Sequence, residues 1–103
     1  MEIALDPAKR AKTLQERALD FADAGEVFSG LTFTATNDRH DYGEIRFITA
    51  GYLHGRFVVL VWTERGGARH IISMRSGHER EKRRWRRRSR RRAGAGRGVL
   101  RPG

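Results

Sequence analysis

Arg69, Ser73 and Arg75 are separated by even numbers of residues in a stretch rich in β-branched side chains. In a regular strand such residues project from one face, where fixed guanidinium groups can hold a phosphodiester and stabilise a pentacovalent transition state. Glu64 would lie across a hairpin from Arg69, as a proton acceptor or as a group that orients the guanidinium. The same spacing is typical of an ordinary cross-strand ion pair beside a solvated face, so both interpretations stay open.

His70 is a candidate general acid or base, because imidazole exchanges protons near neutral pH. The predicted register points it to an apolar face, which favours a packed structural histidine. The acidic stretch of Asp38, Asp41 and Glu44 lacks the fixed turn chemistry of a cation site, and the histidines lack metal-ligand spacing. The chain also contains no cysteine. We therefore expect no metal and no other cofactor.

The net charge of +10 lies entirely in the last part of the chain. Ten Lys/Arg balance ten Asp/Glu over residues 1–78, whereas residues 79–103 carry twelve Lys/Arg and two Glu. Such a block binds phosphates without regard to sequence because it releases counterions, and Trp85 within it could stack on an exposed base. A solubilising tail has the same composition, so the charge alone predicts contact with RNA or DNA but no function.

The length fits one domain. We expect a folded core over residues 1–78, a basic helix over 79–92 and a disordered Gly/Arg tail over 93–103. No stretch approaches the roughly 18 apolar residues of a membrane span, and the lack of cysteine fits a reducing compartment. We therefore predict a cytoplasmic protein with no membrane contact.

Two short helices are predicted in the N-terminal third. Asp6 followed by Pro7 is a typical helix start, and Asp20 offers a second N-cap. Apolar residues at three-to-four spacing follow each start, and Gly30 ends the second run. The pair predicts a helical hairpin.

Strand-like segments follow the helices, and their bounds are Leu31–Thr36, Ile45–Leu53, Phe57–Thr63 and Arg69–Met74. The dipeptides His54-Gly55 and Gly66-Gly67 are typical of two-residue hairpin turns. The pattern predicts an α+β fold, in which the helical hairpin packs on an antiparallel β-meander.

Two-residue turns would make one face of the meander almost entirely apolar, and this face is predicted to carry the helices. Its members are Arg46, Ile48, Ala50, Tyr52, Phe57, Val59, Val61, Thr63, His70, Ile72 and Met74. The other face would hold Arg69, Ser73 and Arg75 together. A slip of one residue would exchange the two faces.

Seven short segments, in a fixed order, carry a family resemblance. They are Asp6-Pro7-Ala8-Lys9, Asp20-Phe21-Ala22-Asp23-Ala24, Val27-Phe28, Asp41-Tyr42-Gly43-Glu44-Ile45-Arg46-Phe47-Ile48-Thr49, Val59-Leu60-Val61-Trp62-Thr63, Arg69-His70-Ile71-Ile72-Ser73-Met74-Arg75 and Glu79-Arg80-Glu81. Together they resemble the BrnT family of bacterial toxins over roughly residues 2–85. No single segment is diagnostic.

The resemblance implies a toxin of a type II toxin–antitoxin system, with a fold related to the RelE ribonucleases. Such a toxin cleaves RNA to arrest translation. Its implied partner is a BrnA-like ribbon-helix-helix antitoxin, through which alone it reaches operator DNA. The polar positions that match the family pattern are Glu44, Arg46, Thr63, Arg65, Arg69, Ser73 and Arg75.

We predict a metal-free reaction in which a 2′-hydroxyl attacks the neighbouring phosphodiester. The predicted catalytic residues are Arg75, Arg69, Glu64, Ser73 and His70, and the predicted substrate-binding residues are Arg46, Thr63, Arg65 and Trp85. Arg75 and Arg69 would clamp the phosphate between them.

The sequence departs from the family pattern in three places. Glu16-Arg17-Ala18 replaces a common Lys-His-Gly, so the first helix loses its glycine cap. Ser76-Gly77-His78 replaces a more helix-forming link and is expected to loosen the connection to the last helix. The Arg- and Gly-rich tail extends past the usual end, and such a composition also arises when a GC-rich gene is read in a shifted frame.

Two other functions remain open. One is a non-enzymatic RNA- or ribosome-binding protein whose tail supplies the affinity. The other is a decayed toxin that still binds its antitoxin. RNA cleavage by a folded chain without the tail would favour the enzyme over the binding protein.

Overall fold

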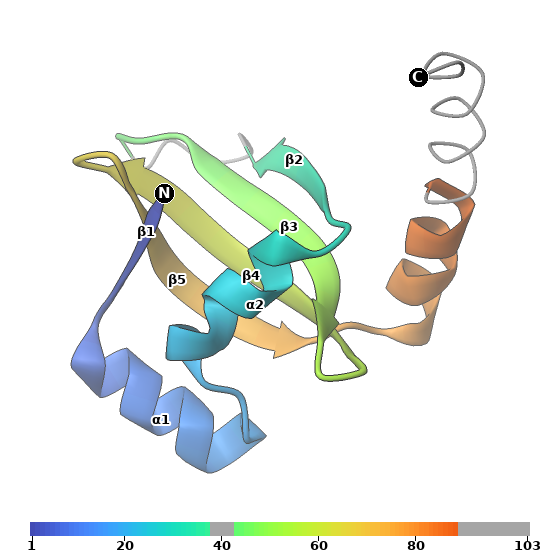
Figure 1. Cartoon of the computed structure of the whole chain (residues 1–103), viewed down its shortest axis with the longest axis horizontal. Coiled ribbons are helices and arrows are strands. Elements are labelled where there is room, and N and C mark those ends of the chain that lie inside the picture. The colour runs from blue at the N-terminus through green and yellow to red at the C-terminus, as the bar shows by residue number, and fades with distance from the viewer. Residues whose placement is uncertain (38–42, 89–103) are drawn as a thin grey trace.

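The computed structural model describes residues 1–37 and 43–88. They form an α+β fold built on a five-stranded mixed sheet with strand order β1-β5-β4-β3-β2 (Figure 1). The expected disordered segment at 93–103 and the end of the basic helix expected at 79–92 lie outside the described residues.

Apart from the first strand, the elements follow the predicted order. Their bounds are β1 Glu2–Leu5, α1 Pro7–Arg17, η1 Phe21–Asp23, α2 Ala24–Ser29, β2 Phe33–Asn37, β3 Arg46–Leu53, β4 Arg56–Arg65 and β5 Ala68–Ser76. A C-terminal helix covers residues 79–88 of the described chain. Both predicted N-caps form, because the carboxylates of Asp6 and Asp20 each accept a backbone N–H bond of 2.9 Å. The second helix begins with the 3₁₀ turn η1.

The first strand corrects the predicted antiparallel meander. β1 pairs with β5 in parallel, with Ile3 beside Arg69 and Leu5 beside Ile71. Its four residues are too few to show an alternating pattern in the sequence. The meander of β2 to β5 is antiparallel as predicted, and β1 makes the whole sheet mixed.

Both hairpin turns have the predicted length of two residues. Leu53 pairs with Arg56 and Arg65 with Ala68, so two residues span each turn. All four turn residues have positive φ, between 49° and 81°. This is the geometry that a type I′ turn requires.

A β-bulge interrupts the pairing of β5 with β4. Trp62 lies opposite Ile71, whereas the preceding residue, Val61, lies opposite Ser73. Ile72 is therefore an extra residue, and it reverses the alternation of side chains along the rest of β5.

The bulge separates residues that were predicted to share a face. Arg69 projects toward the helices, where its guanidinium lies over the ring of Phe28. Beyond the bulge Met74 is the residue buried on that side, so Ser73 and Arg75 project from the other face. The prediction that Arg69, Ser73 and Arg75 lie side by side is therefore wrong.

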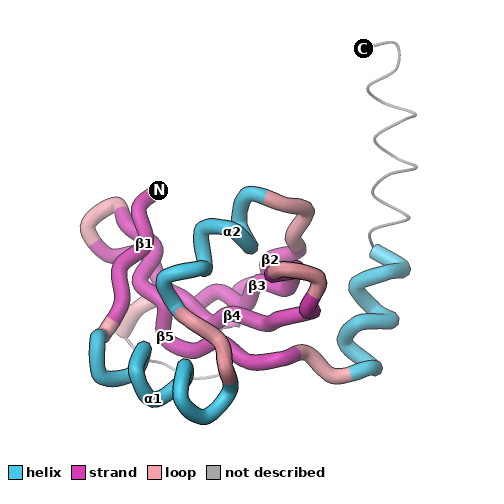
Figure 2. The backbone as a smooth tube through the Cα atoms, turned by 60° about the horizontal axis from the view of Figure 1, so that its bottom comes forward, coloured by secondary structure: helices cyan, strands magenta, loops and turns pink. Residues whose placement is uncertain are grey.

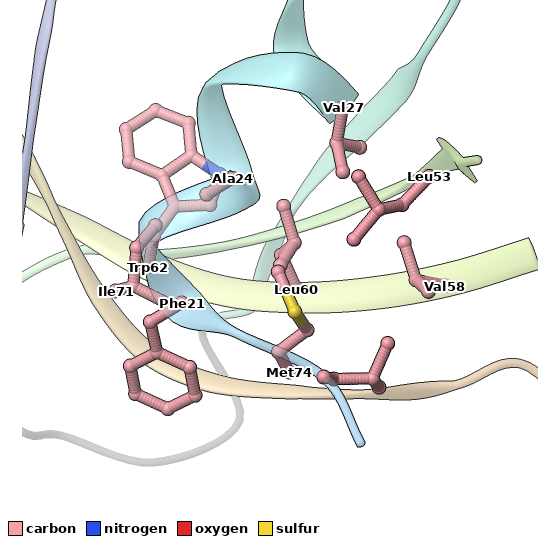
Figure 3. Close-up of a cluster of buried hydrophobic side chains, with 10 residues drawn as sticks. Phe21, Ala24, Val27, Leu53, Val58, Leu60, Trp62, Ile71 and Met74 are labelled. Carbon is pink, nitrogen blue, oxygen red and sulfur yellow. The ribbon is translucent and has the colours of Figure 1, made fainter. Parts of the chain in front are cut away.

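The assignment of the two faces is also wrong for the residues before the bulge, whereas Ser73, Met74 and Arg75 lie on the predicted faces. The turn η1 and the helix α2 cover the face, here called the helix face, that contains the main core (Figure 3). The core residues are Leu19, Phe21, Ala24, Val27, Leu53, Val58, Leu60, Trp62, Ile71 and Met74. The opposite face is apolar too, and the C-terminal helix packs on it through Trp85. Hydrophobicity in the sequence therefore could not distinguish the two faces.

The buried polar residue Thr49 fits the helix face because its hydroxyl is fully used. It accepts a bond of 2.8 Å from the indole N–H of Trp62 and shares one of 2.7 Å with Thr34. A buried hydroxyl with two partners carries little desolvation penalty.

Helix α1 is held by polar contacts and not by packing. It contains no buried residue, and Figure 2 shows it at one edge of the molecule. Arg10 pairs with Asp20 at 2.7 Å, Arg17 donates to the carbonyl of Met74 at 2.9 Å, and Arg56 donates to the carbonyl of Arg17 at 3.1 Å. The position of α1 therefore depends on its ends.

Ala18 occupies the C-cap of α1 in the left-handed conformation, with φ 57° and ψ 34°. A side chain costs roughly 1 kcal/mol there, and Ala18 is exposed, so Ala18→Gly should raise the free energy of unfolding by about 0.5–1 kcal/mol. The matched change Ala11→Gly, within the same exposed helix, should lower it by about 1 kcal/mol. Urea unfolding of both variants measures the difference, and two changes of the same sign would contradict this account.

Candidate active site

A row of polar side chains crosses three strands on the face opposite the helix face. Arg46 of β3 pairs with Thr63 of β4, which pairs with His70 of β5. Glu44 and Arg65 flank the row. We call this face the groove face, because a groove lies between it and the C-terminal helix.

Glu44 holds the arginines at this end of the groove face. It accepts two bonds from Arg65, of 3.2 and 2.9 Å, and lies 4.0 Å from Nε of Arg46. The hydrogen bond from Arg65 is the main reason why the pKa of Glu44 lies below its usual value. A carboxylate of this kind is a weak proton acceptor, so its chemistry here is to fix the two guanidinium groups.

Thr63 is in the predicted row but is almost fully buried, with 1% of its surface exposed. Its hydroxyl donates a bond of 2.6 Å to the carbonyl of Ile45. Because the hydroxyl proton is already donated to this carbonyl, a substrate could contact the Thr63 hydroxyl only by donating a hydrogen bond to it.

Arg75 lies farther along the same face and is bound to the C-terminal helix. Its guanidinium donates two bonds to the carboxylate of Glu81, of 2.9 and 2.8 Å. Glu81 also accepts the backbone N–H of His78 at 2.8 Å, which caps the helix start. The bond from Arg75 is the main cause that lowers the pKa of Glu81 to about 2.

The low pKa of Glu81 predicts a pH dependence of stability. A carboxyl whose pKa is depressed on folding stabilises the fold above its unfolded pKa, 4.5, and this contribution is lost as the pH falls toward 2. The stability difference between wild type and Glu81→Gln should therefore be present at pH 6 and vanish near pH 2. The two side chains are 38% and 31% exposed, so solvent screening limits the difference to about 1 kcal/mol. Thermal unfolding across this pH range measures it, and a constant difference would contradict the assignment.

Trp85 anchors the C-terminal helix on the groove face. Its ring meets those of Phe33, Tyr52 and Phe57 edge-on, with centroid distances of 6.1, 5.1 and 6.1 Å. A ring in such a cluster is a structural anchor, which limits the stacking on bases expected for Trp85.

The link before this helix is close to the sheet, contrary to the expectation that it is loose. Gly77 donates its backbone N–H to the carbonyl of Phe57 at 2.9 Å. A Cβ at this position would lie 2.2 Å from a ring carbon of Phe57. The glycine therefore allows a close approach that a side chain would prevent.

Arg69 and Glu64 lie on the helix face. They pair across the hairpin as predicted. The Arg69 guanidinium lies 4.0 Å from the ring centroid of Phe28 and 5.2 Å from that of Trp62, an arrangement typical of cation–π contacts. The sheet separates this pair from Arg75, so Arg69 and Arg75 cannot clamp one phosphate.

The structure thus brings most, but not all, of the predicted site residues to one face. The groove face holds Arg46, Thr63, Arg65, His70, Ser73, Arg75 and Trp85. The structural roles of Glu44 and Glu81 were not predicted from the sequence. Glu81 follows His78 by three residues, the spacing of a helix-capping carboxylate, and this signal could have been recognised.

Two kinds of site are absent from the described part of the chain. Over residues 1–37 and 43–88, no three His, Asp or Glu side chains gather where they could hold a metal ion. In the same residues no helix is long and apolar enough to cross a membrane.

A known family model covers most of the chain. The model of the ribonuclease toxin BrnT, of type II toxin–antitoxin systems, matches residues 5–81. The chain belongs to the BrnT family. No curated protein sequence matches it. Membership confirms the resemblance found in the sequence and identifies a ribonuclease toxin, a class that has an antitoxin partner and an RNA substrate.

Proposed function

We propose that this BrnT chain is a metal-independent endoribonuclease that cleaves RNA on the groove face and thereby arrests translation. One observation carries the proposal. Cationic and hydroxyl side chains from three strands converge on a single face of the sheet, next to a basic helix. An RNA backbone laid along this face would meet fixed positive charge at both ends of it.

The reaction we propose is an internal transesterification. The 2′-oxygen forms a bond to the adjacent phosphorus while the bond to the 5′-oxygen breaks, which leaves a 2′,3′-cyclic phosphate and a 5′-hydroxyl. His70 would exchange the proton, and the guanidinium group of Arg75 would stabilise the charge on the phosphorane. Arg46, at the other end of the face, would bind a neighbouring phosphate of the RNA. Ser73 lies two residues from Arg75 and would donate a hydrogen bond to the phosphate.

Arg75 has two tasks in this proposal. Glu81 orients its guanidinium and leaves part of it to meet a phosphate, since the Arg75 side chain is 38% exposed. Arg69 and Glu64 receive no direct contact with that phosphate, because they lie across the sheet. Arg65 supports the site through Glu44.

The proposal also includes the partners of this chain. A BrnA-like ribbon-helix-helix antitoxin would neutralise the chain and link it to operator DNA, and the target in translation would place it in the cytoplasm. The fold of the chain would be related to that of the RelE ribonucleases.

A non-enzymatic RNA-binding protein is the second candidate, favoured by the twelve Lys/Arg of residues 79–103. Expression of the full chain and of a chain that ends at Arg88, with and without the neighbouring antitoxin gene, separates the two. This truncation keeps Trp85 and the C-terminal helix. The enzyme predicts RNA degradation and growth arrest by both chains, reversed by the antitoxin. Arrest by the full chain without RNA cleavage would favour the binding protein.

A further inference from the structure

A groove of about 280 Å³ lies between the sheet and the C-terminal helix, beside the proposed phosphate site. Its apolar floor comes from three strands and includes Ala35, Ala50 and Val59. Its wall on the helix includes Arg84, Trp85 and Arg88. We propose that this groove binds one unpaired nucleobase of the RNA substrate, with the neighbouring phosphate held by Arg84 and Arg88; the inference rests on the proposed function.

The position of the groove fits a nucleotide next to the cleaved bond. Val59 pairs directly with Arg75 on one side and with Ala50 on the other. Neighbouring strands lie about 5 Å apart, so a nucleotide whose phosphate meets Arg75 has its base within reach of this floor.

The size of the groove favours a single base. Its volume lies at the lower end of the range of small-molecule sites. The alanines of the floor leave space for a flat ring, whereas a helix of a partner protein needs a longer apolar surface.

The wall supplies the polar groups that a nucleotide needs. Arg84 and Arg88 are exposed and one helical turn apart, and among the described residues neither has an acidic partner. The buried indole N–H of Trp85 also has no acceptor in the described part of the chain. Buried donors normally have an acceptor, and a base carbonyl or ring nitrogen would be a suitable one.

Equilibrium binding of the full chain to a single-stranded 2′-fluoro oligonucleotide tests the inference, because this probe lacks the attacking hydroxyl and is not cut. The double change Arg84→Ala/Arg88→Ala should weaken binding about tenfold more than Arg83→Ala/Arg87→Ala. The second pair removes the same charge from the same helix but does not line the groove. Equal losses would mean that the helix attracts RNA only through its charge, and would overturn the inference.

An abasic scan of the probe tests the base contact itself. Removal of the base at one or two positions should weaken wild-type binding about tenfold, because the base would lose its apolar contacts with the floor and its hydrogen bond with Trp85. In Ala50→Leu, which fills the groove, the same removal should have less than a twofold effect. A penalty below twofold at every position in the wild type would overturn the inference, as would a loss of antitoxin binding without any loss of RNA binding in Arg84→Ala/Arg88→Ala.

Cleavage of ordinary RNA by the same wild-type sample separates the two claims. Cleavage without an abasic penalty would overturn the base site and leave the proposed function intact. A penalty without cleavage would support the base site and contradict the enzyme.

Discussion

Arg75→Ala should reduce RNA cleavage by about 100-fold or more and abolish growth arrest, whereas Glu81→Gln should keep cleavage within a few-fold of the wild type. The loss expected for Arg75 is that of one fixed donor to a transition-state oxyanion. Glu81 contacts the guanidinium and not the substrate, so its amide variant retains an uncharged hydrogen-bond partner. Single-turnover cleavage of a short RNA measures both rates.

The comparison separates a phosphate-binding role of Arg75 from a purely structural one. If Arg75 served only to attach the C-terminal helix through its ion pair, Glu81→Gln, which also removes this ion pair, would lose a comparable fraction of activity. Unfolding curves for each variant are the control, because the free energy of their ion pair is about 1 kcal/mol and both proteins should remain folded.

His70→Asn should lower the cleavage rate by about 100-fold, since a positioned acid or base contributes on this order. The matched control is His54→Asn, in the exposed turn between β3 and β4, where φ is 49° and asparagine is well tolerated. Cleavage rates measured from pH 5 to 8 test the role directly. His70→Asn should lose the rate dependence in this range, and His54→Asn should keep it. An unchanged pH profile in His70→Asn would leave this histidine a structural residue.

Local chemistry allowed much of the fold to be predicted. The N-caps at Asp6 and Asp20 and the turns at His54-Gly55 and Gly66-Gly67 each depend on a few adjacent residues. The side chains or the backbone freedom of these residues determine the local geometry, so the caps and turns can be predicted from the sequence alone. The family resemblance depends only on the order of the segments, and the family match confirmed it.

The faces of the sheet depended on a feature that local patterns do not reveal. Strict alternation along β5 placed Arg69 and Arg75 together, but the bulge at Ile72 separates them. Ile71 and Met74 are both core residues, and two core residues three apart in a strand require an extra residue between them. The sequence does not show this, because Ile72 and Met74 fit a regular alternation equally well.

The choice of covered face failed for a different reason. Both faces are apolar, one under η1 and α2 and the other under Trp85. The assignment of Trp85 to substrate binding left the predicted basic helix over 79–92 without a place on the sheet. The ion pair of Arg75 with Glu81 was missed with it, since it joins a strand to that helix.

The central claim is that RNA is cleaved by its own 2′-hydroxyl on the groove face, without a metal. Analysis of the RNA ends that the purified full chain produces in excess EDTA tests this claim most directly. The account predicts undiminished cleavage with 2′,3′-cyclic phosphate and 5′-hydroxyl ends, and none from a 2′-fluoro substrate. Cleavage that stops on chelation, or that leaves 5′-phosphate ends, would contradict it.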